Sequence, residues 1–153
     1  MANPVKPIPE GYHTVTPYLI CDGASQAIEF YKKAFGAVEA VRMAMPNGKI
    51  GHAELKIGDS FIMLADDSPE YAAYSPQHYG GSPISVLLYV PDTDATVAQA
   101  VSVGAKITRP LKDEFYGDRT ATIVDPFGHT WYIHTHMKDV TPEEMKKAMQ
   151  GAG

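Results

Sequence analysis

The sequence predicts an α+β protein that contains two copies of one β-α-β-β-β unit. Apolar residues recur at a spacing of two in some stretches and of three to four in others, which distinguishes strands from helices. The same order of strand-like and helix-like stretches occurs twice along the 153 residues. Matching positions also keep register, because Asp22 and Asp92 lie 70 residues apart and Met63 and Tyr132 lie 69 apart. Such a repeat indicates an internal duplication.

The first copy begins with a strand and a helix. Alternation of polar and apolar residues predicts a strand over Thr14–Ile20. Apolar residues at helical spacing between Ala24 and Phe35 predict a helix, and Gly36 is well placed to end it. Asn47-Gly48 is typical of a two-residue hairpin turn. Three further strands are predicted in this half, over Val38–Met45, Lys49–Ile57 and Phe61–Ala65.

The second copy repeats this order. A β-branched and leucine-rich run predicts a strand over Ile84–Val90. Asp94 is a candidate cap for the helix that follows, and Gly104 is placed to end it. Three more strands are predicted over Lys106–Arg109, Arg119–Val124 and Thr130–His136, the last two joined by the turn Asp125-Pro126-Phe127-Gly128.

Three segments lie outside the repeat. Residues 1–11 form an expected extended arm, and Thr141-Pro142-Glu143-Glu144 predicts a short helix within the tail of residues 139–153. The linking loop, residues 66–81, is rich in proline, glycine and tyrosine. A loop of this length is often functional, but tyrosines in loops also cover the edges of a core, so both a lid and a cover are compatible with it.

Composition limits the classes of function. With 44% hydrophobic and 20% charged residues, the chain is an ordinary globular protein of one domain or two very small halves. The net charge of −5 argues against nucleic-acid and anionic-membrane partners. No apolar run is long enough to span a bilayer and no signal peptide is visible, so a cytoplasmic location is expected. The single cysteine, Cys21, is expected to be a buried thiol.

Several local strings, in their order and spacing, carry a resemblance to a known family. They are Thr16-Pro17-Tyr18-Leu19, Ile28-Glu29-Phe30-Tyr31 with Phe35-Gly36-Ala37, Gly51-His52-Ala53-Glu54, Tyr116-Gly117-Asp118-Arg119 and Asp125-Pro126-Phe127-Gly128-His129. Together with the duplication, they resemble the vicinal oxygen chelate superfamily of glyoxalase I, bleomycin-resistance proteins and extradiol dioxygenases, and within it the PhnB-like branch. The resemblance covers residues 12–140 and implies a single domain of two modules, 12–66 and 82–138, that form a half-barrel around a central cavity. It also implies a homodimer.

Strand alternation then assigns side chains to the cavity, because every second residue of a strand lies on the same face. The expected wall combines apolar and aromatic surface with a few polar anchors, which is the usual composition of a ligand pocket. The candidate ligand-binding residues are Thr16, Tyr18, His52, Glu54, Met63, Ser85, Leu87, Tyr89, Arg119, Tyr132 and His134.

The resemblance also implies where metal ligands would lie. In the metal enzymes of the superfamily, each half supplies a His, Gln or Glu from its first strand and another from its last. Here the four positions are Thr16, Ser85, Met63 and Tyr132, and none of them is such a ligand. A slip of one residue would bring His13 to the inner face but leave the other three positions empty. We therefore predict no standard metal site and no cofactor.

Two other groups of residues have alternative interpretations. The pairs His52/Glu54 and His134/His136 each lie on one strand face, so they are either a substitute Zn²⁺ or Fe²⁺ site or hydrogen-bonded residues of the cavity wall. Arg119 either clamps a carboxylate or phosphate of a ligand or pairs with a neighbouring acid, Asp118 or Glu54.

Two functions from different classes follow. The first is a metal-free protein that binds a small aromatic or amphipathic molecule, and by resemblance such binding would confer resistance by sequestration. The alternative is an isomerase, lyase or dioxygenase of the same fold, which would use a non-standard metal site or metal-free acid–base chemistry. The catalytic candidates for that alternative are Glu54, His52 and Tyr132.

Overall fold

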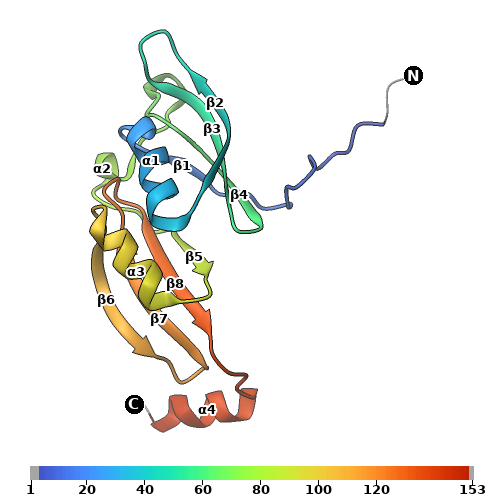
Figure 1. The fold of residues 1–153 in the computed structure, drawn as a ribbon, viewed down its shortest axis with the longest axis vertical. Helices are drawn as coiled ribbons and strands as arrows, with labels where there is room; N and C mark the ends of the chain where they lie inside the picture. The colour runs from blue at the N-terminus through green and yellow to red at the C-terminus, as the bar shows by residue number, and fades with distance from the viewer. Residues whose placement is uncertain (1–3, 152–153) are drawn as a thin grey trace. The chain divides into compact units, whose positions relative to one another are not determined.

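The computed structural model describes residues 4–151, and the chain divides into two compact units between Gly81 and Ser82. Each unit contains a four-stranded mixed sheet with a helix against one face (Figure 1). The predicted α+β class is therefore confirmed. Within residues 4–151, every helix is too short or too polar to cross a lipid bilayer.

The first unit follows the predicted order of elements. It contains β1 (Tyr18–Ile20), α1 (Ala24–Phe35), β2 (Val38–Ala44), β3 (Ile50–Ile57) and β4 (Ser60–Ala65). The strands lie in the order β1-β4-β3-β2. β1 runs parallel to β4, and the other neighbours are antiparallel. α1 packs on β2 and β3 and ends at Gly36, as predicted.

The second unit repeats this topology. It contains β5 (Ser85–Tyr89), α3 (Thr93–Ser102), β6 (Lys106–Asp113), β7 (Asp118–Val124), β8 (Thr130–His136) and the terminal α4 (Pro142–Gly151). The strand order β5-β8-β7-β6 is that of the first sheet. Tyr18 pairs with Met63, and Leu87 pairs with Tyr132, so the same offset of 69 residues relates both partners. The structure thus contains the duplication that the sequence predicts.

The core of each unit lies between its helix and its sheet. In the first unit, Ile28 and Tyr31 of α1 are fully buried, as are Leu55 and Leu64 of the sheet. In the second unit the fully buried residues include Ile123, Trp131 and Ile133. Cys21 is also buried, as expected. Alternate residues of the strands lie on the opposite face, which the helix does not cover; we call it the open face.

Most strands match the predicted ranges to within two residues, but β1 and β6 differ from them by four. β1 begins at Tyr18 rather than Thr14, because Pro17 lacks the N–H that continued pairing requires; only its carbonyl oxygen accepts a bond, from Met63 N at 3.0 Å. β6 extends to Asp113 rather than ending at Arg109. Pro110 is tolerated within it because β6 is an edge strand, and the pairing with β7 shifts register on either side of Arg109.

The start of α3 also differs from the prediction. Asp92, not Asp94, caps this helix, and its carboxylate accepts a bond from Ala95 N at 3.1 Å. Asp94 lies in the first turn, where it pairs with Arg119. Gly104, with a φ of +120°, follows the C-cap residue Val103 rather than serving as the cap itself.

The hairpin at Asn47-Gly48 forms with a different turn from the one predicted. Gly48 N donates to Met45 O at 2.9 Å, so Pro46 and Asn47 are the central residues, and Gly48 follows them with a φ of +85°. The two residues of the motif therefore lie one position later in the turn than a two-residue loop would place them.

The segments outside the repeat contain more structure than predicted. Residues 66–81 include a 3₁₀ turn (η1, Pro69–Tyr71) and a short helix (α2, Pro76–Tyr79). Tyr74 stacks on His78 within the same segment, with 3.9 Å between ring centroids. At α4, Thr141 Oγ1 accepts from Glu144 N at 3.2 Å, which is one half of the predicted capping box.

Candidate functional site

The open face of the first unit carries a connected row of polar side chains. The Tyr18 hydroxyl lies 2.9 Å from His52 Nδ1, and His52 Nε2 lies 2.8 Å from a carboxylate oxygen of Glu54. The hydroxyl of Tyr12, from the segment that precedes β1, donates to the other Glu54 oxygen. The Tyr12 ring stacks on Phe61 of β4 at 4.4 Å. The N-terminal segment is thereby attached to this face.

Hydrogen bonding assigns the roles within this row. The carboxylate of Glu54 accepts from His52 Nε2–H, so in the neutral imidazole Nδ1 is the acceptor for the Tyr18 hydroxyl. Bonds from Tyr12 and His52 lower the pKa of Glu54. Burial, together with the bond to Glu54 and its charge, raises the pKa of Tyr12 to about 12. Glu54 is therefore a stable anion with both oxygens engaged, which does not suit a free general base.

The open face of the second unit contains a different cluster. Asp118 at the start of β7 is 5% exposed, and its two oxygens accept from His134 Nδ1 at 3.0 Å and His136 Nδ1 at 2.7 Å. His136 Nε2 also reaches Asp139 at 2.7 Å. Burial of Asp118 opposes its ionisation, but the bonds from the two histidines outweigh this effect and lower the pKa of the carboxyl. Bonds to Asp139 and Asp118 raise the pKa of His136.

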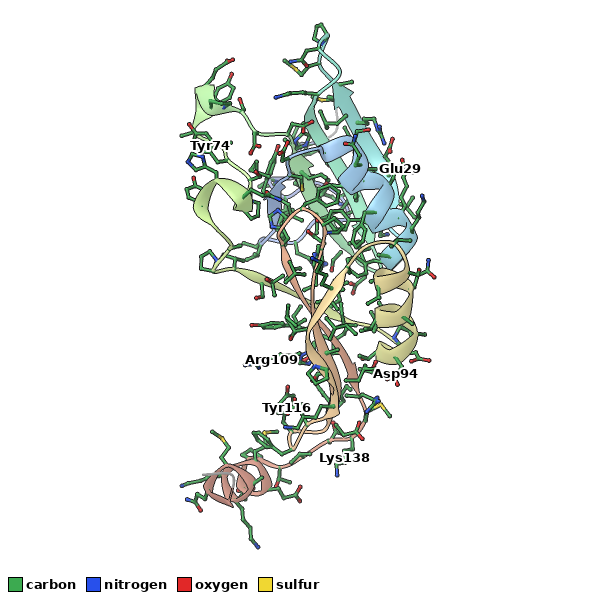
Figure 2. The ribbon with its side chains drawn as sticks, turned by 90° about the vertical axis from the view of Figure 1, so that its left-hand side faces the viewer. Glu29, Tyr74, Asp94, Arg109, Tyr116 and Lys138 are labelled. Atoms are coloured by element: carbon green, nitrogen blue, oxygen red, sulfur yellow. The ribbon has the colours of Figure 1, made fainter. Side chains whose placement is uncertain are left out.

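Beside this cluster lies a pocket of about 440 Å³ formed entirely within the second unit. The residues that line it come from β6, β7, β8 and the turn before β7: Arg109, Pro110, Lys112, Glu114, Tyr116, Thr120, Thr122, Tyr132 and His134. Figure 2 shows Arg109 and Tyr116 on the side of the sheet away from α3, whereas Asp94 lies with the helix.

Strand register arranges the open face of the second unit in two rows. The first row crosses the sheet through Arg109, Thr122, Tyr132 and Leu87. The second row crosses it through Lys112, Thr120, His134 and Tyr89. Adjacent members of a row lie about 5 Å apart, which is the spacing of paired strands. Each row therefore runs from a basic residue through a threonine to an aromatic ring.

Comparison with known proteins identifies the family. Residues 12–133 match the family described as the Glyoxalase/Bleomycin resistance protein/Dioxygenase superfamily. The chain belongs to this superfamily. The resemblance predicted from local strings is thus confirmed, because the match covers both repeats and most of the chain.

This superfamily member is similar in sequence to one protein, and in structure to two others, that illustrate its relationships. An uncharacterized protein of Mycobacterium bovis is 39% identical over 142 residues, which are 91% of this chain and 93% of that protein. The X-ray structure of a gene product from Arabidopsis thaliana is 28% identical with a TM-score of 0.65, covering 80% of this chain and 98% of that one. The PhnB protein of Bacillus cereus has a TM-score of 0.61 at 16% identity over 80% of this chain and 99% of that one. This last likeness concerns the fold alone, so membership of the PhnB-like branch stays a prediction.

The superfamily's metal chemistry can be tested against the side chains of this member. Met63 lies beside Tyr18, and Tyr132 lies beside Leu87. Ser85 begins β5, whereas Thr16 precedes β1 and lies outside the sheet. A thioether, a phenol and two aliphatic hydroxyls make a donor set that does not fit a divalent ion. Among residues 4–151, no group of three or more His, Cys, Asp or Glu side chains is arranged to hold a metal ion.

The four residues considered for a substitute metal site take part in local hydrogen bonds instead. His52 and Glu54 bond to each other in the first unit. His134 and His136 both bond to Asp118 in the second. These contacts agree with the interpretation of the two pairs as hydrogen-bonded residues of the open faces.

Arg119 lies on the face of its sheet that α3 covers. Its guanidinium forms two bonds to Asp94, at 2.6 and 3.1 Å, and one to Asp113 at 3.1 Å. These contacts raise the pKa of the Arg119 guanidinium above its ordinary value. Of the two interpretations of Arg119, the structure supports ion pairing, although its partners are not Asp118 or Glu54. The residue does not share a face with His134.

Several residues of these clusters escape sequence reasoning. Tyr12, Asp118 and Tyr116 lie outside regular strands or at their ends, where periodicity is uninformative. Thr120 and Thr122 had a usable signal, because they alternate with the apolar Ala121 and Ile123 in a predicted strand.

Proposed function

We propose that this superfamily member binds a small aromatic or amphipathic molecule on the open face of its second sheet. The observation that supports the proposal is the pocket of about 440 Å³, which falls in the size range of small-molecule sites. Two tyrosines, Tyr116 and Tyr132, supply aromatic surface there, and threonine, histidine and arginine side chains supply polar contacts.

Exposed apolar surface beside the pocket supports the same proposal. Tyr132 is 39% exposed, and its row neighbour Leu87 and the nearby Tyr89 are also exposed. Tyr132 lies on the inner strand β8 and the other two residues lie on the edge strand β5. Exposed apolar side chains grouped in this way are typical of a binding surface. A ligand with an aromatic ring would cover them while its polar groups meet the threonines and His134.

A thermal-shift screen tests the proposal. The full chain is screened against neutral, anionic and cationic aromatic compounds and amphipathic drugs, and binding to the folded state raises the melting temperature. Tyr132→Ala should abolish the shift of every hit. Tyr71→Ala, which changes an exposed tyrosine of η1 outside the pocket, should leave it unchanged. A panel that leaves the melting temperature unchanged, or hits that Tyr132→Ala retains, would refute the proposal.

Resistance by sequestration is the cellular role proposed for this binding. It requires that the bound compound is toxic and that the protein is produced in stoichiometric excess over it. Expression of the chain should raise the inhibitory concentration of a toxic hit, and expression of the Tyr132→Ala variant at equal level should not. Equal protection by the parent protein and the Tyr132→Ala variant would show that the resistance does not depend on the pocket.

A second candidate function, catalysis, is favoured by the row on the first sheet. Tyr18, His52 and Glu54 are linked so that the imidazole is fixed in one orientation, as in a base and its orienting carboxylate. Incubation of the hits with the protein, followed by mass spectrometry, distinguishes the two functions. Product formation that Glu54→Gln abolishes would support catalysis, whereas recovery of unchanged compound supports binding alone. The hemithioacetal of methylglyoxal and glutathione belongs in this assay as the glyoxalase substrate.

We also propose that the two modules over residues 12–140 act as a single domain and that the protein is a homodimer. The support for both comes from membership of the superfamily. Light scattering coupled to size-exclusion chromatography would show twice the chain mass of 16.6 kDa for a dimer. A mass of one chain at micromolar concentration would refute the dimer.

A further inference from the structure

The pocket of the second unit contains one guanidinium without a protein partner. Within residues 4–151, the side chain of Arg109 takes part in no hydrogen bond or ion pair. Lys112, the basic residue of the neighbouring row, lies 3.8 Å from Glu114, which partly compensates its charge. Glu114 also accepts from Thr120 Oγ1 at 3.2 Å. Arg109 is therefore the cation of this pocket that remains available for an anionic ligand.

The position of Arg109 directs its charge over the pocket. Its strand neighbour is Thr122, which in turn pairs with Tyr132. The backbones of β6 and β8 are thus about 10 Å apart, two strand spacings, and Arg109, Thr122 and Tyr132 all line the pocket. Thr122 makes no side-chain hydrogen bond within residues 4–151, so its hydroxyl is also available to a ligand.

His134 lines the same pocket, with its ring position fixed by its neighbours. Its side chain is 12% exposed, and its Nδ1–H donates to the buried Asp118. In the neutral ring, this bond leaves Nε2 as a lone-pair acceptor. The ring is held further by Tyr116, which stacks on it at 6.3 Å, and by Tyr89, whose ring meets it edge-on at 6.0 Å. A ligand hydroxyl group can donate to Nε2 of this neutral ring.

We propose that the pocket takes a small aromatic carboxylate that also bears a hydroxyl group. Its carboxylate pairs with Arg109, its ring lies against Tyr132, and its hydroxyl donates to His134 Nε2. A planar guanidinium matches a carboxylate through two parallel bonds, and one uncompensated cation matches a monoanion better than a phosphate dianion. This inference rests on the proposed function and narrows it to one class of ligand.

Calorimetric titration of the full chain with matched probes tests the inference. The probes are 4-hydroxybenzoate and 4-hydroxyphenylacetate, their primary amides, which lack the charge, and benzoate and phenylacetate, which lack the hydroxyl. We expect the hydroxy acids to bind about tenfold to a hundredfold more tightly than their amides, which is the usual contribution of a charge-assisted bond. We expect a smaller loss, of about fivefold, without the hydroxyl.

Two variants locate the anion. Arg109→Gln should reduce the affinity for the acids to that for the amides. Lys106→Gln, a matched loss of charge at an exposed position of β6 outside the pocket, should change it by less than about threefold. Amides that bind as tightly as acids, or equal effects of the two variants, would overturn the inference. If only neutral aromatic compounds bind, the inference fails while the proposed function stands. If no compound of any charge binds, both fail.

Discussion

The Asp125→Asn substitution removes the acceptor of one buried hydrogen bond and leaves its neighbours intact. Asp125 is 4% exposed in the turn between β7 and β8. Its Oδ1 accepts from Phe127 N at 2.8 Å and from His129 N at 3.0 Å. Its Oδ2 accepts from the indole Nε1 of Trp131 at 2.8 Å, on the fully buried side of β8. An asparagine that keeps the two backbone bonds places an amide NH₂ against the indole N–H.

The size of the effect follows from this geometry. A hydrogen bond to a charged acceptor contributes about 1.5–3 kcal/mol, and an unsatisfied buried donor costs a similar amount. Rotation of the amide would not help, because its NH₂ would then face two backbone N–H groups. We therefore expect Asp125→Asn to lower the free energy of unfolding by about 2–3 kcal/mol. Asp125→Ala loses the bonds to Phe127 N, His129 N and the indole, and it should cost more.

Urea denaturation followed by far-UV circular dichroism measures this loss. A double-mutant cycle with Trp131→Phe assigns it to the indole, because Asp125→Asn should cost about 1.5 kcal/mol less once the indole N–H is absent. Asp59→Asn, at an exposed turn, is the matched control and should stay within about 0.5 kcal/mol of the parent protein. A cost for Asp125→Asn below about 0.5 kcal/mol, or independent effects in the cycle, would refute the reasoning.

Three further predictions concern other charged groups. Glu54→Gln should lower the pKa of Tyr12 from about 12 toward its ordinary value, because burial then acts without the carboxylate. Besides burial, the Glu54 charge also raises the pKa of Tyr18, so tyrosinate absorbance should develop at lower pH in the variant than in the parent protein. The bond to Asp139 raises the pKa of His136 in the folded state. Protonation of His136 therefore stabilises the fold fully below the unfolded-state pKa of about 6.5. This stabilisation is lost as the pH rises through the folded-state pKa. Asp139→Asn should weaken the dependence of the urea midpoint on pH over the range in which His136 titrates. Asp92→Ala should lower the free energy of unfolding by about 1 kcal/mol through loss of the α3 cap.

The repeat itself provides a control for the capping prediction. Asp22 occupies the position in the first unit that corresponds to Asp92, but Gly23 is the N-cap of α1. The carboxylate of Asp66, not that of Asp22, accepts from Gly23 N and Ala24 N, both at 3.0 Å. Asp22→Ala should therefore have little effect on unfolding. If Asp22→Ala and Asp92→Ala lowered the free energy of unfolding equally, the effect of Asp92→Ala would not come from the α3 cap.

Residue spacing predicted most strands and both repeat helices because their signals are local. The faces of β4 and β8 followed from alternation alone: Ile62 and Leu64, like Trp131 and Ile133, are buried on the helix side. β6 was underestimated because proline normally interrupts a strand. Whether Pro110 is tolerated depends on the strand's position at the sheet edge, which no local pattern contains.

The candidate site was less predictable than the fold. The pairing of His52 with Glu54 follows from their spacing on one strand. The attachment of Tyr12 to Glu54 joins residues that are 42 positions apart, and its segment has no periodicity. Arg119 had several acids within reach of its strand, and only the position of α3 shows that Asp94 is the partner.

The sequence by itself determined the α+β class and the duplication, because apolar periodicity and turn residues act over a few neighbouring positions. Its local strings carried the resemblance to the superfamily. The assignment of Thr16, Ser85, Met63 and Tyr132 to the positions of the superfamily's metal ligands stays a prediction. Only the tertiary structure decided which polar groups meet. Asp118 lies between two histidines, and Arg109 lies beside Thr122 with no side-chain partner among the residues that the structure describes. These contacts depend on strand register and on the shift at β6, and both are set by packing between segments that are distant in the chain.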